Sequence, residues 1–473
     1  MSQTITIDPV TRLEGHGKIT IQLDDRGEVA DAHFHVTQVR GFEKFCEGRP
    51  FYEMPSLTAR ICGICPVSHL LASAKACEAI MSVRIPHTAA QLRRVLNLAQ
   101  MVQSHALSFF HLSSPDLLLG MEADPAVRNI FGVAATRPEL GRAGIGLRRF
   151  GQRVIELLGS KRIHTGWVIP GGVTEPLSAA NRDEILAMLH EAFANVKLAL
   201  GAYKEIASTF KPEIEVFANF PSMYLGLVNE DESIEFTDGD LRLIDARGKL
   251  VDDGITAARF PDVIGEAVEP YSYTKFVYYK PLGYPEGSYR VGPLARLNIV
   301  KRMGTPLADT ELAEFKQIAE GPVQSSFHYH HARLVEVLYG IEKIEQILAD
   351  PRILDKHVRA TAGVNRLEGA GQIEAPRGCL HHHYKVDEDG KMTWASLVVA
   401  TGHNNNAMNK GVLQSAKAYV REGKFTEGAL NRVEAVIRTF DPCLSCSTHA
   451  FGQMPLAMTL VSAGGEVVDR VVR

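Results

Sequence analysis

Two cysteine pairs stand near opposite ends of this chain, and they set the strongest constraint on its fold. Cys62 and Cys65 form one C-x-x-C motif, and Cys443 and Cys446 form the other. Such a turn lets both sulfurs face one metal ion, but two thiolates do not complete a site on their own. The other three of the seven cysteines are scattered. The sequence therefore predicts that the two ends of the chain meet in one site of four thiolates.

The cysteine pairs alone leave other uses of these thiols open. Two C-x-x-C pairs are typical of structural zinc, although zinc modules usually place their pairs about 12–20 residues apart. A C-G-x-C motif such as residues 62–65 also occurs in thioredoxin-like redox proteins, which use one pair in a βαβ setting. The long separation favours a site that the fold assembles, but the residues themselves do not decide between these uses.

Composition narrows the class of protein. The chain has 473 residues, 45% of them hydrophobic, which is enough for a large core and two or three lobes. A net charge of −4 with both signs interspersed indicates no nucleic-acid or membrane partner. No apolar run approaches the ~20 residues of a transmembrane helix, and residues 1–30 lack the features of a signal peptide. An odd number of cysteines without an export signal indicates reduced thiols or metal ligands, so we expect a cytoplasmic protein.

The first half of the chain is predicted to form a small β-meander and then long helices. Alternating residues indicate strands at Ile5–Ile7, Lys18–Leu23 and Val29–Val39. A helix from Pro66 to about Ile80 would place the first cysteine pair at its N-terminus, where the helix dipole favours thiolate. Apolar residues at helical spacing predict a central bundle from three long helices: Thr88–Leu112, which should end at residues 113–116, then Arg137–Leu158 and Asn181–Phe210.

The second half is predicted to mix strands and helices. Short strand-like segments between Gly- and Pro-rich turns indicate a smaller lobe, with strands at Met223–Val228, Leu241–Ile244 and Phe276–Tyr279. Helices should resume at about Leu307–Ala319 and Phe327–Ala349, and a final pair should reach Phe440. Between them we expect a glycine-rich loop at residues 369–378 and a buried strand at Trp394–Ala400.

These elements together predict the fold class and the lobes. The fold should be α+β and mainly helical, with a central bundle of long helices, an N-terminal β-hairpin or meander and a smaller mixed α/β lobe. The expected divisions are an N-terminal β region at 1–40, a helical core at 41–211, the mixed lobe at 212–300, a helical and strand region at 301–449, and a C-terminal extension at 450–473.

Three consecutive histidines, His381 to His383, resemble a metal-binding tract. On an extended strand, however, neighbouring side chains point to opposite faces of the sheet. We therefore do not expect the three imidazoles to bind one ion.

The motifs around the cysteine pairs carry a family resemblance. The stretches R-x-C-G-x-C-x-x-x-H at residues 60–69 and D-P-C-x-x-C-x-x-H at 441–449 resemble the paired signatures of the large, catalytic subunit of nickel–iron hydrogenases. The chain looks closest to the soluble, NAD-reducing bidirectional group. The resemblance implies nickel held by all four cysteines, with Cys65 and Cys446 bridging to an iron that carries two cyanides and one carbon monoxide. Cys62 and Cys443 would be terminal nickel ligands.

The resemblance also implies a route for protons. Heterolytic splitting of H2 needs a Lewis acid and a base within reach. The metals would be the acid and the Cys443 thiolate the base. Glu14, in the motif R-L-E-G-H, would accept the proton next, although a loop carboxylate of this kind is often only solvated. Arg377 is the alternative base, and its guanidinium is normally fixed in the charged form.

Other residues receive supporting roles from the resemblance. Arg377 with Asp116 and Asp441 would form a canopy over the open site, and its donors would bond one cyanide, while Thr401 would bond the other. His69 would donate to a bridging thiolate. Two further residues would hold Mg²⁺ beneath the site: Glu43, in the motif R-G-x-E, and His449.

The chain should need partners to complete an electron route. Cys46, Cys77 and Cys379 are too few for a common iron–sulfur cluster, and no dinucleotide or phosphate-binding glycine motif occurs. We therefore expect a small iron–sulfur subunit, and the resemblance implies flavin- and NAD-binding diaphorase subunits carrying FMN. Coupling to a deazaflavin, NADP or ferredoxin is the alternative. A respiratory complex I quinone-site subunit shares this ancestry but lacks the four cysteines.

The last residues are predicted to form a hairpin, with strands at Leu456–Val461 and Glu466–Val472. The resemblance implies that a maturation endopeptidase removes residues 450–473 after His449, once nickel-insertion factors have acted. The sequence would then be the uncleaved precursor. We expect the attached extension to hold Cys446 and His449 away from the site.

Overall fold

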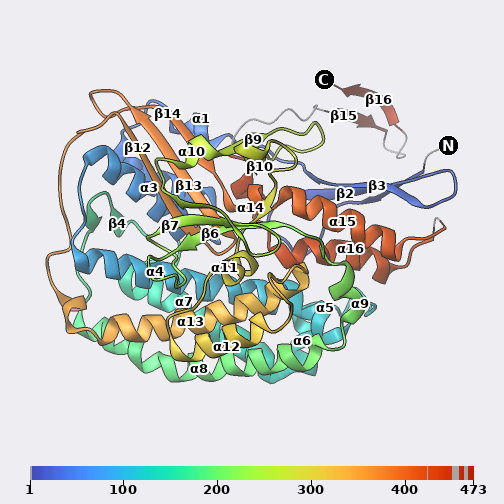
Figure 1. Ribbon diagram of the computed structural model, residues 1–473, viewed down its shortest axis with the longest axis horizontal. Coiled ribbons are helices and arrows are strands. Elements are labelled where there is room, and N and C mark those ends of the chain that lie inside the picture. The colour runs from blue at the N-terminus through green and yellow to red at the C-terminus, as the bar shows by residue number, and fades with distance from the viewer. Residues whose placement is uncertain (1–2, 423, 450–456, 463–466, 473) are drawn as a thin grey trace.

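A bundle of four long helices forms the base of the molecule in the computed structural model, which describes residues 3–422, 424–449, 457–462 and 467–472 (Figure 1). Helix α4 packs against α7 and α13, and α8 packs against the same two helices. The predicted central bundle of long helices is therefore confirmed. Its members are α4 (His87–Ala106), α7 (Pro138–Gly159), α8 (Ala179–Ala207) and α13 (Tyr329–Ala349).

The sequence of α8 shows why such a helix forms. The Ser178 side chain caps its N-terminus by accepting a hydrogen bond from the backbone of Asn181. Its buried residues recur at three- and four-residue spacing from Ile185 to Tyr203, so one stripe faces α7 and α13. By length and composition alone α8 could also cross a membrane. That criterion is weak evidence, because core helices of soluble proteins pass it as well.

The end of α4 differs from the prediction. The regular helix stops at Ala106, and the chain continues without a break as a π-helical segment, η3 (Leu107–Ser113), and then as α5 (Ser114–Leu119). The predicted end at residues 113–116 was therefore wrong. Pro115 lies in the first turn of α5, where its missing N–H costs nothing. This arrangement places Asp116 inside the protein on a helix.

The N-terminal meander is confirmed. Three antiparallel strands pair in chain order: β1 (Gln3–Ile7), β2 (Gly17–Leu23) and β3 (Val29–Val36). Alternate residues such as Ile19, Ile21 and Phe34 are buried, as period-two patterning requires.

The mixed lobe contains a four-stranded sheet in the order β11-β6-β7-β8 and a separate pair, β9-β10. Its buried residues form their own hydrophobic cluster, to which Cys379 and Val398 contribute from the neighbouring sheet. The lobe divisions at 212 and 300 remain a proposal. The strands are β6 (Met223–Val228), β7 (Asp240–Ile244), β8 (Leu250–Ile255), β9 (Ile264–Ala267), β10 (Phe276–Tyr279) and β11 (Tyr289–Arg290).

A third sheet occupies the region where the sequence predicted a glycine-rich loop. Strands β12 (Glu368–Ala375), β13 (Gly378–Val386) and β14 (Met392–Val398) pair antiparallel, and helix α3 (Pro66–Met81) packs on β12 and β13. The glycines serve this packing. A Cβ on Gly369 would lie 2.4 Å from the Ala76 carbonyl oxygen, and one on Gly371 would lie 2.3 Å from that of Ala72. Glycine in this strand therefore permits close approach of a helix.

The remaining described helices are short or lie near the C-terminus. The two helices predicted before Phe440 are α15 and α16. The set comprises α1 (Phe42–Cys46), α2 (Met54–Thr58), α6 (Ile130–Thr136), α9 (Lys211–Val216), α10 (Phe260–Val263), α11 (Pro293–Ile299), α12 (Pro306–Lys316), α14 (Ala400–His403), α15 (Asn405–Tyr419), α16 (Glu427–Phe440) and α17 (Leu444–Ser447). The short pair β4 (Val168–Ile169) and β5 (Gly172–Val173) precedes α8.

The two strands of the predicted C-terminal hairpin are confirmed. Strand β15 (Ala457–Val461) pairs antiparallel with β16 (Val467–Val472) at the outer edge of the molecule (Figure 1). Residues 450–456 and 463–466, which the prediction also included, lie outside the described residues.

Candidate metal centre

The two cysteine pairs stand on similar local structures. Cys65 is the residue that precedes the first turn of α3, and the backbone N–H groups of Ile64 and Cys65 donate to the Cys62 sulfur over 3.2 and 3.4 Å. Cys443 likewise precedes α17, a helix of four residues that carries Cys446. Each pair thus uses a helix N-terminus, whose dipole favours an anionic sulfur.

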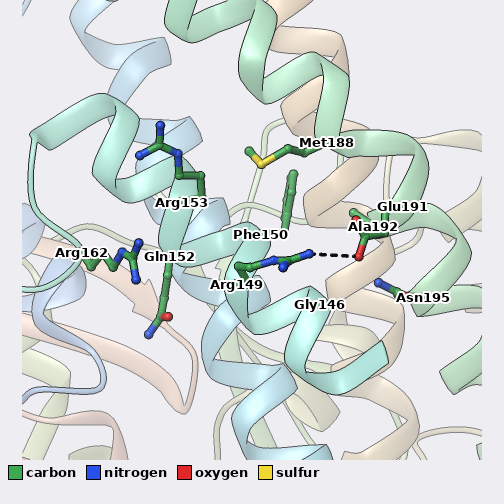
Figure 2. A pocket seen from close by; sticks show the side chains of 10 residues that line it. All are labelled: Gly146, Arg149, Phe150, Gln152, Arg153, Arg162, Met188, Glu191, Ala192 and Asn195. Carbon is green, nitrogen blue, oxygen red and sulfur yellow. Dashed lines mark hydrogen bonds and ion pairs between the residues drawn. The ribbon is translucent and has the colours of Figure 1, made fainter. Parts of the chain in front are cut away.

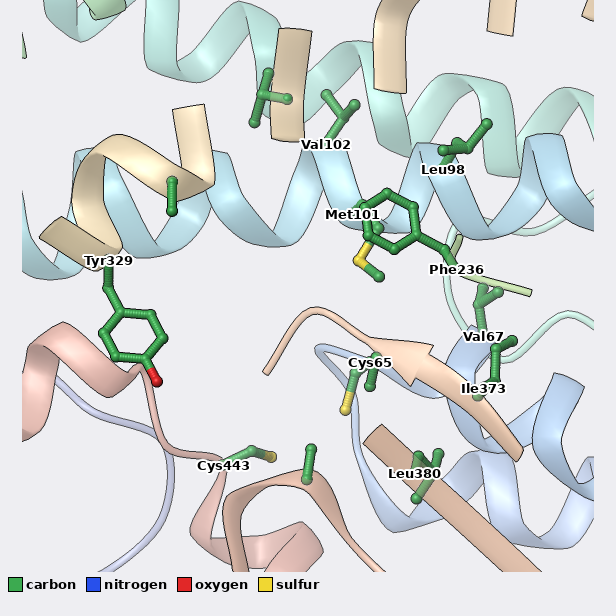
Figure 3. Close-up of a cluster of buried hydrophobic side chains, with 14 of the residues drawn as sticks. Cys65, Val67, Leu98, Met101, Val102, Phe236, Tyr329, Ile373, Leu380 and Cys443 are labelled. Atoms are coloured by element: carbon green, nitrogen blue, oxygen red, sulfur yellow. The ribbon is translucent and has the colours of Figure 1, made fainter. Parts of the chain in front are cut away.

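The fold brings the four sulfurs together. The Cys62 and Cys443 sulfurs lie 3.4 Å apart, those of Cys65 and Cys446 lie 3.6 Å apart, and those of Cys443 and Cys446 lie 2.9 Å apart. All four sulfurs lie within 4.8 Å of one another and are buried. In Figure 3 the side chains of Cys65 and Cys443, both members of the hydrophobic cluster, extend toward each other. The predicted joining of the chain ends is confirmed.

The electrostatics of the four sulfurs suit a cation. Hydrogen bonds from the other three cysteines hold the pKa of Cys62 well below its usual value. Burial raises the pKa of Cys443 and Cys446 well above it. Four thiolates in one buried cluster would repel one another, so a metal that binds them must displace protons. The donor set fits a soft or borderline metal such as nickel or zinc.

Glu14 lies directly against the second cysteine pair. It forms an isolated parallel β-bridge with Cys443, and its carbonyl oxygen accepts from the Leu444 N–H over 3.1 Å. Its carboxylate oxygen Oε2 accepts from the Ser445 N–H over 3.0 Å and lies 3.1 Å from the Cys443 sulfur. Gly15, at φ +93°, makes this approach feasible, because a Cβ there would lie 2.6 Å from Leu444 Cβ. Glu14 is thus in reach of the Cys443 proton.

Arg377 is buried beside the cysteines and pairs with Asp441. Its Nε donates to the Asp441 carbonyl oxygen over 2.5 Å, and its terminal nitrogen lies 3.0 Å from the carboxylate. Burial acts to lower the pKa of Arg377, but the charges of Asp441 and Cys443 outweigh it and raise that pKa. Asp441 ends α16 in a left-handed conformation, at φ +53°. This reversal turns the chain from α16 into the Cys443 motif.

Thr401 contacts the cysteine motif directly, whereas Asp116 does not pair with Arg377. The Thr401 hydroxyl oxygen accepts from the Cys443 N–H over 3.0 Å, which leaves its own proton for another acceptor. Asp116 belongs to a separate ion-pair network, in which Arg12 and Arg438 bind its two oxygens over 2.5 and 2.9 Å. Among the described contacts Arg377 pairs with Asp441 and not with Asp116, so the structure does not join the three residues that were expected to form the canopy.

The predicted Mg²⁺ residues lie next to each other. Glu43 Oε1 lies 3.1 Å from His449 Nδ1, and it accepts from the Leu397 N–H over 2.7 Å. The Glu43 N–H in turn donates to the His449 carbonyl oxygen over 3.1 Å. Burial acts to raise the pKa of Glu43, but the hydrogen bond with His449 and the charge of Lys275 act to lower it, and Lys275 also pairs with Glu266.

The expected effect of the C-terminal extension was wrong. Cys446 is seated among the other sulfurs and His449 against Glu43 in a chain that still carries the hairpin. Backbone hydrogen bonds explain this, because the N–H groups of Arg40 and Gly41 donate to the Thr448 carbonyl oxygen over 3.0 and 3.1 Å. The segment before the extension is thereby held in place.

His69 is buried one helical turn after Cys65, and its Nδ1 lies 3.2 Å from His382 Nε2. Burial lowers the pKa of His69 to about 4, against the opposing charge of Cys62. Of the triple histidine, His381 stacks on Phe260 and His383 pairs with Glu368. The alternation expected for a strand is confirmed. The role of His382 as a neighbour of His69 was not predicted, since only the packing of α3 on β13 reveals it.

A surface cavity of about 270 Å³ lies away from these residues. It opens between α7 and α8 and is lined by Arg149, Phe150, Arg153 and Met188, among others (Figure 2). Arg149 is paired across it with Glu191. It contains none of the predicted site residues.

The chain is similar to known proteins along nearly its whole length. Residues 40–128 and 245–449 match the family described as nickel-dependent hydrogenase, and residues 4–39 match one described as HoxL-like. The beta subunit of the NAD-reducing hydrogenase HoxS from Cupriavidus necator is 40% identical, and the match covers 100% of both chains.

Solved structures agree with this match. A crystal structure of an NAD+-reducing NiFe hydrogenase in the H2-reduced state superimposes with a TM-score of 0.92 at 43% identity, over 94% of this chain and 99% of that one. The Ni-Fe-Se hydrogenase of Desulfovibrio vulgaris Hildenborough, in its oxidized state, has a TM-score of 0.77 at 25% identity, over 95% and 100%. The chain belongs to the nickel-dependent hydrogenase family, as a nickel–iron hydrogenase large subunit with four cysteines gathered at its metal centre.

Proposed function

We propose that this chain is the catalytic subunit of a hydrogenase that reversibly splits H2 and passes the electrons to NAD+, by the overall reaction H2 + NAD+ = NADH + H+. The observation that carries the proposal is the buried cluster of four sulfurs with Glu14 against Cys443. The full-length similarity to a NAD-reducing hydrogenase subunit supports the choice of acceptor. A structural zinc site would need no such carboxylate.

The donor set fits a nickel–iron centre. Cys62 and Cys443 would hold nickel as terminal ligands, and Cys65 and Cys446 would bridge to an iron bearing two cyanides and one carbon monoxide. When bound, this group supplies the Lewis acid that polarises H2. The chain's own residues supply the base, the proton carrier and the surroundings of the open position.

Proton transfer runs from Cys443 to Glu14. The Cys443 thiolate would serve as the base, and its sulfur lies 3.1 Å from Glu14 Oε2, which is within hydrogen-bond reach. The N–H of Ser445 holds the same oxygen, so the carboxylate stays in place between transfers. Glu14 is partly exposed, which lets it release the proton to the outside.

Arg377, Asp441 and Thr401 would line the open side of the centre. A buried guanidinium needs a carboxylate partner, and Asp441 meets that need. Arg377 would donate to one cyanide and the free Thr401 proton to the other. Arg377, the alternative base, is less suited to accept a proton. The charges of Asp441 and Cys443 raise the pKa of its guanidinium by more than burial lowers it, so it stays protonated.

We place Mg²⁺ between Glu43 and His449. A carboxylate and an imidazole in contact suit a hydrated cation. Asp116 would act at a distance from the open site, by holding Arg12 and Arg438.

The chain requires electron-transfer partners. Cys46, Cys77 and Cys379 are free, buried thiols outside the four-sulfur cluster, so a small iron–sulfur subunit must take the electrons. Flavin- and NAD-binding diaphorase subunits would follow, and the free thiols suit the cytoplasm. Nickel-insertion factors and an endopeptidase acting after His449 would complete maturation.

Metal analysis with infrared spectroscopy tests the proposal. This chain, separated from its iron–sulfur partner, should contain nickel and iron in equal amounts and show bands of one metal-bound carbonyl and two cyanides. NAD+ reduction under H2 by the whole complex would establish the acceptor. Zinc alone, without these bands, would instead support the structural-zinc alternative.

A further inference from the structure

Arg377 lies in the tight turn of a two-stranded hairpin beside the metal centre. The last residue of β12, Ala375, pairs with the first residue of β13, Gly378. Only Pro376 and Arg377 lie between them, so the turn is two residues long. Asp441 holds the end of the Arg377 side chain, which is long and flexible. The position of the Arg377 backbone therefore depends on what holds the turn.

Arg296 on α11 binds this turn with its whole guanidinium. It donates to the carbonyl oxygens of Ala375 over 3.1 Å and of Pro376 over 3.3 Å. Its Nε and one terminal nitrogen also donate to the two carboxylate oxygens of Glu336, each over 2.7 Å. The other terminal nitrogen donates to the Glu374 carboxylate over 2.6 Å. All five N–H groups of the guanidinium therefore have an acceptor.

The two carboxylates connect the turn to the rest of the fold. Glu336 belongs to α13 of the central bundle, and its carboxylate lies 2.8 Å from Nε2 of His105 on α4. Glu374 belongs to β12, and its second oxygen accepts from the Leu227 N–H over 2.9 Å. Arg296, Glu336 and Glu374 are all 0% exposed. Buried charges of this kind keep a fixed geometry, because a displacement would leave one of them without its partner.

A second residue of α11 contacts the backbone of Arg377 itself. Gly292 is the residue before the first turn of α11, and its carbonyl oxygen accepts from the Arg296 N–H over 2.9 Å. A Cβ on Gly292, where φ is +91°, would lie 2.8 Å from the Arg377 carbonyl oxygen. Glycine thus lets the helix approach this carbonyl directly. The first turn of α11 therefore holds the hairpin turn at two places, with Gly292 at Arg377 and Arg296 at the two residues before it.

Neutralising charge is not a sufficient explanation for Arg296. A lysine would also neutralise carboxylates, but its three donors could not serve two carboxylates and two carbonyl oxygens at once. Ala375 and Pro376 are buried, and buried carbonyl oxygens need hydrogen-bond donors. The planar guanidinium supplies donors to the two residues that precede Arg377 while both carboxylates hold it in place.

We propose that Arg296 is a positioning residue that fixes the backbone of Arg377 and thereby aims its guanidinium at the open side of the metal centre. The inference rests on the proposed function, in which Arg377 donates to one cyanide of the iron. Among the described contacts Arg296 touches none of the four cysteines, so it acts through the turn. Misplacing an active-site group by ~1 Å costs roughly 10²-fold in rate, which makes a rigid backbone at Arg377 worthwhile.

Infrared spectra of the metal-loaded complex give the first test. Arg296→Lys keeps a positive charge beside the two carboxylates but loses donors to the turn. The Arg377 guanidinium should then move away from its cyanide, so the separation between the two cyanide bands should change. Unshifted bands in this variant at normal nickel content would overturn the proposal.

Arg93→Lys is the matched control for the loss of a buried guanidinium. Arg93 is 2% exposed and binds the Glu78 carboxylate and two backbone carbonyl oxygens, those of Ile169 and Gly172. Among its described contacts none is in the hairpin turn. Arg93→Lys should therefore leave the cyanide bands unshifted, and a shift equal to that of Arg296→Lys would refute the inference.

A second variant acts on the same backbone without changing any charge. Gly292→Ala places a Cβ against the Arg377 carbonyl oxygen and should also change the separation of the cyanide bands. Gly283→Ala is its control, because φ is +74° and ψ 175° there, close to the +91° and −164° of Gly292, and a Cβ meets nothing within 4 Å. Equal spectra in these two variants, both at normal nickel content, would count against the proposal.

Hydrogen exchange of the full-length, metal-free chain gives a test that does not depend on metal loading. In Arg296→Lys the backbone amides of residues 377–380 should exchange roughly tenfold faster than in the wild type, relative to those of β14 in the same sample. The comparison with β14 removes the effect of a general loss of stability, and Arg93→Lys should change both segments equally. An unchanged ratio in Arg296→Lys would refute the inference. Missing nickel and missing carbonyl and cyanide bands in the wild type would refute the proposed function instead.

Discussion

Replacing Gly371 by alanine should displace helix α3 and, with it, one half of the metal centre. The added Cβ would lie 2.3 Å from the Ala72 carbonyl oxygen and 2.6 Å from the Ala76 nitrogen, whereas ordinary contacts begin at 3.4 Å. Because both opposing atoms are backbone, the helix must move away by about 1 Å. Overpacking of this kind costs about 1–3 kcal/mol of unfolding free energy. In an open strand the same change would instead stabilise, because alanine restricts the unfolded chain.

The displacement also predicts a loss of activity, since α3 begins at the residue after Cys65. Misplacing a reacting group by ~1 Å costs roughly 10²-fold in rate. Urea unfolding and H2-dependent dye reduction measure the two effects. Gly363→Ala is the control, because a Cβ there meets nothing within 4 Å, and it should change the unfolding free energy by less than about 0.5 kcal/mol. A Gly371→Ala enzyme as stable and active as this control would refute the packing argument.

Four further predictions concern the site and its supports. Cys446→Ser should abolish nickel binding and H2 turnover, since it removes a thiolate ligand; a nickel-loaded, active variant on elemental analysis would contradict this. Glu14→Gln should keep the infrared bands but slow H2/D+ exchange by about 10²–10⁴-fold, and equal exchange would move the proton route to Arg377. Arg296→Met should cost about 3–5 kcal/mol in urea unfolding, because it leaves the buried carboxylate of Glu374 without its cation and that of Glu336 with His105 alone; a loss below about 1 kcal/mol would show that they are neutral. Burial lowers the pKa of His328 to about 4, so the unfolded chain binds the extra proton and stability should fall as pH drops from about 6.5 toward 4; His328→Gln should lessen that fall, and an unchanged pH profile would exclude this group.

Sequence predicted the metal centre well, because its ligands lie in two short motifs whose chemistry is local. We could assign four cysteines to one site because thiolates are metal ligands and the sequence contains only these two C-x-x-C motifs: Cys62, Cys65, Cys443 and Cys446. Long helices such as α8 were likewise visible in the spacing of their apolar residues. Residues whose role depends on a distant neighbour were missed, and His382 is the clearest example, since only the packing of α3 on β13 assigns it a partner.

The misread elements have physical reasons as well. The π-helical turn at Leu107–Ser113 keeps the apolar pattern of a helix, so periodicity does not reveal where the regular helix ends. Glycines at 369 and 371 usually mark a loop, and only an opposing helix shows them to be strand residues. Asp116 was assigned to Arg377 by resemblance, yet three arginines lie near it: Arg12, Arg128 and Arg438. Which of several cations meets a carboxylate is decided by the whole fold.

The separation of the cysteine pairs also has a consequence for biosynthesis. Cys62 and Cys443 lie 381 residues apart. At about 5–20 residues per second, a ribosome delivers the second pair roughly 20–80 s after the first. During that interval Cys62 and Cys65 are a half-site, open to oxidation and to any soft metal ion in the cell. Insertion of the correct metals therefore follows translation. A chaperone that covers the two thiols, or a reducing environment, would protect the nascent chain until its C-terminal cysteine pair is synthesised.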